Sequence, residues 1–185
     1  MVRYYNATYP RYNFRKPSEE GPEDSIIIRI KMSKFRRCRI GSEIFGSKMS
    51  ARHVKSLFVL AKFVTGDEED EDDEEDDSVD CYPGQIQYFF KHTINFPNGP
   101  AEHFLAYILW YQPDEDNRYY FSSNDNYNTC NVELWKPEFH DESRDCIILV
   151  HHILSRFIPV KYRISDQRNA CEYLAVNPLN RKYHI

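Results

Sequence analysis

The densest group of side chains that could do chemistry lies in residues 140–152. Histidine, cysteine and carboxylate groups follow one another closely there: His140, Asp141, Glu142, Asp145, Cys146, His151 and His152. A structural zinc site usually shows a closely spaced ligand pair, such as C-x₂₋₄-C or H-x₃₋₅-H, and only Cys146 and His151 come near that spacing. We therefore expect no metal and no cofactor, with the adjacent histidines pointing in opposite directions or one of them satisfied in the core.

The same segment has an alternative interpretation as a metal-dependent nuclease or hydrolase remnant. In that case Asp141, Glu142 and Asp145 would hold a divalent ion. Such sites usually draw carboxylates from separate strands, whereas residues 141–145 have the mixed charge of one exposed loop. A solvated turn is the favoured interpretation.

Other catalytic signatures are missing from the sequence. No GxSxG motif marks a nucleophile, and the six glycines form neither GxGxxG nor GxxxxGK[ST]. We therefore predict no catalytic residue and favour a binding module over an enzyme.

Basic residues are concentrated in the N-terminal third of the chain. Residues 1–62 carry 14 Lys and Arg against 5 Asp and Glu. Basic groups near tyrosines suit contact with phosphates and stacking on bases, and the candidates for nucleic-acid binding are Arg36, Arg37, Arg39, Lys48, Arg52 and Lys55. The alternative is a charged strand edge that prevents aggregation.

Four aromatic residues lie at the ends of expected strands. Trp110 and Tyr111 close the run HFLAYILWYQP, and Trp135 closes NVELW shortly before Phe139. Aromatic side chains beside turns could form a cage for a methylated cation. The competing interpretation places them in the core.

The acidic residues include one unbroken run, Asp67 to Asp77, which holds 11 of the 29 acidic groups. Without it the net charge would change from −5 to +6. Like charges repel when compacted, so we expect a solvated loop over residues 66–80 that is inserted between two strands. It could bind a basic partner or fold over the chain's own basic face.

The remaining pattern predicts a mainly β domain. Short runs rich in β-branched and aromatic residues alternate with turn formers, as in a barrel or a sandwich. The expected strands are 26–31, 38–45, 57–65, 84–95, 103–112, 117–122, 131–135 and 157–164, and Cys146 to Ser155 could be a buried strand or a short helix. We expect a flexible arm over 1–24, a domain over 25–165 and a C-terminal extension over 166–185.

Targeting signals and disulfides are not expected. The first residues lack an apolar signal-peptide core, and no stretch approaches the 18 apolar residues of a membrane span. Five cysteines at wide, irregular spacing indicate reduced thiols.

Three segments resemble the bromo-adjacent homology (BAH) domain, a β-barrel module of chromatin proteins. They are Ala106 to Pro113 (AYILWYQP), Glu133-Leu134-Trp135 with the stretch to Phe139, and Ile147 to Tyr162; Tyr82 to Phe90 is similar to an early barrel strand. The segment from Ile40 to Ile158 also resembles a region of transposon-like proteins in fungi.

The BAH resemblance implies a small β-barrel with short helical segments and a nuclear location. It also implies binding of a histone tail, a nucleosome or another protein, possibly with DNA, and no catalysis. By position, the resemblance assigns Trp110, Trp135 and Phe139 to the cage, with His140 and Asp141 as polar neighbours. The long acidic run departs from the family pattern, which leaves methyl-lysine recognition in doubt.

Overall fold

The computed structural model describes residues 1–29, 31–50, 54–63, 81–113, 132–164 and 171–178. The expected acidic loop, the expected strand at 117–122 and Arg52 lie outside these residues. One α-helix and twelve strands are described: α1 (Val2–Thr8), β1 (Phe14–Arg15), β2 (Ile26–Ile27), β3 (Met32–Phe35), β4 (Arg37–Ile40), β5 (Glu43–Gly46), β6 (Phe58–Lys62), β7 (Cys81–Phe96), β8 (Gly99–Pro113), β9 (Glu133–Phe139), β10 (Ile147–Leu149), β11 (Ile153–Ile164) and β12 (Cys171–Pro178). Short 3₁₀ turns cover Val54–Ser56, Arg144–Cys146 and Val150–His152. The prediction of a mainly β fold is confirmed.

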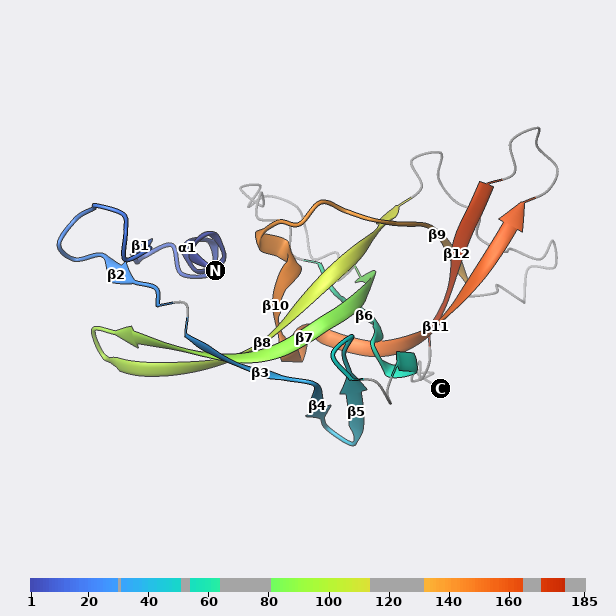
Figure 1. Cartoon of the computed structure of the whole chain (residues 1–185), viewed down its shortest axis with the longest axis horizontal. Coiled ribbons are helices and arrows are strands. Elements are labelled where there is room, and N and C mark those ends of the chain that lie inside the picture. Colours follow the sequence, from blue (N-terminus) through green and yellow to red (C-terminus); the bar gives the residue numbers. More distant parts are fainter. Residues whose placement is uncertain (30, 51–53, 64–80, 114–131, 165–170, 179–185) are drawn as a thin grey trace, which may run out of the picture.

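A large antiparallel sheet dominates the molecule (Figure 1). The long β7–β8 hairpin turns at Pro97 and Asn98, where Phe96 pairs with Gly99. From β8 the pairing continues through β9, β12, β11 and β6 and returns to β7. The six strands are therefore joined in a cycle of pairings, while β3 and β10 extend it at β7 and β8.

The β12 strand corrects the expected domain boundary. It lies between β9 and β11, where Ala175 pairs with both Leu134 and Val160. Leu174 and Val176 are buried in the same cluster as Phe157. Residues 171–178 thus belong to the packed fold and are not an appended extension.

The N-terminal segment also belongs to the packed fold, in contrast to the expected arm. The Tyr5 side chain on α1 is fully buried, and its hydroxyl donates to Nδ1 of His92 on β7 over 2.9 Å. Nε2 of His92 lies 2.8 Å from the Arg29 carbonyl, to which it donates. A cluster around Tyr5 then includes Phe14 and Phe90, so we call it the Tyr5 cluster. Sequence periodicity missed it because its partners lie on β7 and β8, about ninety residues away.

The β4–β5 hairpin and the residues that flank it carry four of the six candidate basic residues. Arg37 and Arg39 alternate with Cys38 and Ile40, and only the second pair packs on the core. A two-residue turn follows, in which Gly41 has a φ of +59°, a conformation that glycine adopts without steric cost. Figure 1 shows the hairpin extending away from the large sheet.

Candidate functional site

Trp110 lies in the interior of the sheet. Only 2% of it is exposed, and its indole Nε1 donates to the Asp145 carbonyl over 2.8 Å. The Phe63 ring meets it edge-on at 5.3 Å between centroids. Gly84 pairs with Trp110 across the β7–β8 ladder, and a Cβ there would collide with Ile108 and lie 3.0 Å from the indole. Trp110 is therefore a packed core residue with its polar atom satisfied.

Tyr111, Trp135 and Phe139 belong to a different cluster, centred on the fully buried Phe157. The Tyr111 and Phe139 rings lie 4.6 Å apart, and burial raises the pKa of Tyr111 to about 12. Trp135 is 9% exposed and donates from its indole to Glu133 over 3.1 Å. Together with Trp110, the four aromatic residues predicted to bind a ligand are split between two clusters, which favours the core interpretation over an open cage.

The expected turn at residues 141–145 is an exposed segment that ends in a capped 3₁₀ turn. The Ser143 hydroxyl accepts from the Asp145 backbone N–H over 3.1 Å, which begins that turn. The Asp145 carboxylate contacts the Ser143 hydroxyl and Nε of Arg144, at 2.9 and 3.2 Å, so local partners already occupy it. Asp141 and Glu142 are exposed.

The histidines of this segment do not join the carboxylates in a metal site. The rings of His151 and His152 meet edge-on at 4.7 Å between centroids, and Cys146 is buried in the core. The pKa of His152 is lowered, mainly by burial and to a smaller extent by the nearby His151 and Lys62. Within the described ranges, no three His, Cys, Asp or Glu side chains are grouped as metal ligands would be.

The candidate basic residues on the β4–β5 hairpin are exposed. Arg37 and Arg39 lie on its first strand, Arg36 directly precedes that strand, and Lys48 follows the second strand. Lys55 is exposed on the 3₁₀ turn that contacts β5. Among the ion pairs found in the described part of the chain, none involves Arg36, Arg39 or Lys48.

The base of this hairpin is fixed by hydrogen bonds. The Ser47 hydroxyl donates to the Arg36 carbonyl over 2.9 Å, and the Lys48 N–H donates to the Ile86 carbonyl over the same distance. The Gly46 N–H donates to the Ser56 hydroxyl over 3.0 Å. These bonds hold the cationic strand in one orientation relative to β7, so its charges form a defined surface.

A stack of side chains across β3, β7 and β8 was not predicted from the sequence. Lys34 on β3 lies 3.9 Å from the centre of the Tyr88 ring, a cation–π contact. Tyr88 in turn stacks on Tyr107 at 5.2 Å. The Tyr107 hydroxyl donates to Glu142, and burial with this bond raises the pKa of Tyr107. These contacts connect Lys34 on β3 to Glu142 in the 140–152 segment. The stack depends on the register of β7 and β8, so it could not be found from the sequence.

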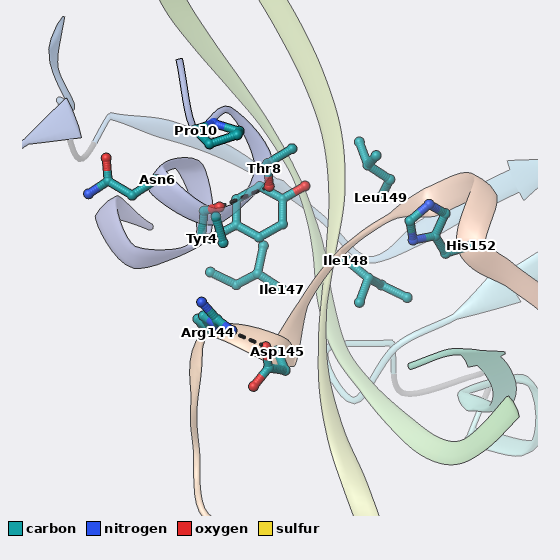
Figure 2. A pocket seen from close by; sticks show the side chains of 11 residues that line it. Tyr4, Asn6, Thr8, Pro10, Arg144, Asp145, Ile147, Ile148, Leu149 and His152 are labelled. Atoms are coloured by element: carbon teal, nitrogen blue, oxygen red, sulfur yellow. Dashed lines mark hydrogen bonds and ion pairs between the residues drawn. The ribbon is translucent and has the colours of Figure 1, made fainter. Parts of the chain in front are cut away.

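A second feature that the sequence did not indicate is a pocket between α1 and β10 (Figure 2). Its volume is about 340 Å³, and its walls come from Tyr4, Ala7, Ile147, Ile148 and Leu149, among others. Arg144 and Asp145 lie at one end in Figure 2, and His152 lies on the side of β10. In the sequence, the apolar run CIILV indicated a buried strand or a short helix at this place, but nothing indicated a cavity beside it.

The sequence matches no family model, and neither the comparison with curated proteins nor that with solved structures gave a match. No helix in the described ranges has the length and apolar character that a membrane crossing needs. The function is therefore inferred from the geometry of the chain itself.

Proposed function

We propose that this chain is a non-catalytic interaction module that contacts DNA phosphates through the basic β4–β5 hairpin. The observation that carries the proposal is the exposure of Arg37 and Arg39 on the anchored strand β4, with Arg36 exposed directly before it. Lys and Arg side chains that approach a nucleic-acid backbone release condensed counterions, which supplies sequence-independent affinity.

Pairing and burial support this choice of surface. Each of three other lysines at the surface, one of them half-buried, already has a carboxylate partner: Lys16 with Glu19, Lys91 with Glu102, and Lys161 with Glu172. The hairpin differs because its one carboxylate, Glu43, pairs with Arg156 on β11 at 3.4 Å. Over residues 36–48 the chain carries four basic residues against this single carboxylate, which is a local excess of positive charge.

The BAH-like interpretation forms the finer part of the proposal. The cycle of six strand pairings and the placement of AYILWYQP within β8 support a BAH-like barrel. We propose a nuclear module that approaches a nucleosome through its DNA. The buried positions of Trp110, Tyr111 and Trp135 argue against an aromatic cage as the route to a histone tail.

The test compares two triple variants in fluorescence anisotropy with a labelled 20-base-pair duplex at several salt concentrations. In R36A/R37A/R39A we expect weaker binding and a log K against log[salt] slope that is less steep by about 2 to 3, since each phosphate contact contributes roughly 0.9. The matched control K16A/K91A/K161A removes the same charge from groups that already have partners, and it should keep the wild-type slope.

Equal slopes in the two triple variants would rule out the hairpin as the DNA surface. Deleting residues 67–77 gives a third arm, because this change removes eleven negative charges. We expect tighter duplex binding from the deletion, through lower repulsion. Cleavage of the duplex after addition of Mg²⁺ or Mn²⁺ would contradict the non-catalytic proposal and support the nuclease alternative.

A further inference from the structure

The pocket between α1 and β10 touches three consecutive residues of one strand. Ile148 faces the core cluster around Trp110, whereas Ile147 and Leu149 pack against the Tyr5 cluster on the opposite face. Successive side chains of a strand point to opposite faces of its sheet. A cavity that borders all three must therefore run along the outer edge of β10.

That outer edge lacks a strand partner in the described part of the chain. β10 is terminal in the sheet, and its described ladder pairs Ile147, Ile148 and Leu149 with Tyr107, Ala106 and Leu105 of β8. In an antiparallel pair, alternate residues direct their N–H and C=O groups away from the partner strand. The pocket thus borders backbone groups that another extended chain can pair with.

The opposite wall of the pocket is held in place. α1 supplies Tyr4 and Ala7, and the neighbouring Tyr5 is tied to His92 on β7 through its buried hydroxyl. The Thr8 hydroxyl donates to the Tyr4 carbonyl over 2.8 Å within the same helix. Because α1 is fixed in this way, an apolar slot remains between α1 and the free edge of β10. The distance between these two walls does not depend on a ligand.

The geometry points to a peptide-binding site in which a partner protein's extended segment adds to the outer edge of β10. An apolar side chain of that segment would fill the slot between Ala7 and Ile147, while its backbone pairs with β10. A free strand edge recognises main-chain amides, so an extended peptide fits it better than a compact apolar molecule. This site lies apart from the basic hairpin and does not depend on the proposed DNA contact.

The site can be tested with a displayed library of random hexapeptides selected on the full chain. We expect enrichment of sequences with apolar residues at alternate positions. The affinity of a synthetic selected hexapeptide should fall about tenfold or more in Ala7→Trp, since the indole would occupy the slot. Arg3→Trp is the matched control, because Arg3 is exposed on the same helix but does not line the pocket. Circular dichroism should show both variants folded.

N-methylation of the selected hexapeptide separates strand addition from simple side-chain insertion. Methyl groups on one alternate set of amides should reduce affinity about tenfold or more, because they remove hydrogen bonds to β10, while methyl groups on the other set should have little effect. The amide signals of residues 147–149 should shift on titration. Failure to enrich any hexapeptide would overturn the proposal, as would equal binding to Ala7→Trp or indifference to both methylation patterns.

Discussion

The basic residues of the β4–β5 hairpin and the aromatic residues Trp110 and Trp135 were both expected to bind partners, but they differ in exposure to solvent. The hairpin presents Arg37 and Arg39 to solvent, whereas Trp110 and Trp135 are packed inside the sheet. Burying an unpaired guanidinium is costly, so a cluster of arginines predicts a surface with little ambiguity. Burying an indole is favourable once its N–H has a partner, so an aromatic residue alone does not identify a surface.

The cycle of pairings explains why the strand ends are covered. β8 pairs with β7 on one side and with β9 on the other, and β12 continues from β9. The aromatic residues near the end of β8 therefore meet those of β9 and β11 across the interior. Trp110 also reaches the backbone of the 3₁₀ turn before β10, through its bond to Asp145.

The largest expected effect is the loss of stability in Trp110→Ala. Removing a large buried aromatic side chain costs about 3 to 5 kcal/mol of unfolding free energy, which is a large part of the stability of a small domain. The variant also leaves the Asp145 carbonyl without its indole donor. Urea denaturation followed by circular dichroism measures the change, with Phe104→Ala, whose side chain is exposed, as the comparison.

A stable Trp110→Ala protein would revive the cage hypothesis. In that case the unfolding free energy would match that of Phe104→Ala, and partner binding alone would change. Our expectation is the reverse, namely that the unfolding midpoint falls steeply for Trp110→Ala and hardly at all for the exposed site.

Several strands could be predicted from the sequence because their alternation is local. The run 57–65 contains β6, and 84–95 lies within β7. The run 38–45 was expected as one strand but forms parts of two, because Gly41 takes the positive φ of a two-residue hairpin turn. Weighting that glycine as a turn signal would have found the hairpin that carries the basic residues.

The N-terminal packing could not be predicted in this way. Tyr5 contacts His92 and His103, at ring distances of 5.5 Å in both cases, and nothing in residues 1–24 reports such distant partners. The same holds for the pocket, since its two walls come from residues 4–10 and 144–152. Local patterns identify strands and charged surfaces, whereas sites between distant segments require the register of the sheet.

A smaller effect is expected from the buried histidine at this packing site. His103 is 9% exposed, its Nε2 has no hydrogen-bond partner among the described residues, and it faces Tyr5, Tyr9 and His92. The pKa of His103 is lowered from its ordinary value of 6.5, mainly by burial and to a smaller extent by His92. Below that pH the unfolded chain binds a proton that the folded chain resists, so stability falls as pH decreases toward the folded pKa.

The measurement is the unfolding free energy of the wild type and of His103→Phe between pH 8 and pH 5. We expect the wild type to lose more stability across this range than the variant, because the phenyl ring cannot titrate. Identical pH profiles would show that His103 does not couple protonation to the packing of α1 against the β7–β8 hairpin.

The smallest effects sharpen the comparison within a single strand. Arg39 is exposed on β4, and its neighbour Ile40 packs against the Trp110 cluster. Arg39→Ala should change the unfolding free energy by no more than about 0.5 kcal/mol, as is usual for surface substitutions. It should nevertheless reduce the salt slope of duplex binding by about 0.9, the contribution of one phosphate contact. Ile40→Ala should do the opposite, with a measurable loss of stability and an unchanged slope. If Arg39→Ala instead destabilises the fold and leaves the slope unchanged, the arginine serves the strand edge, and the alternative interpretation of the basic residues as protection against aggregation gains support.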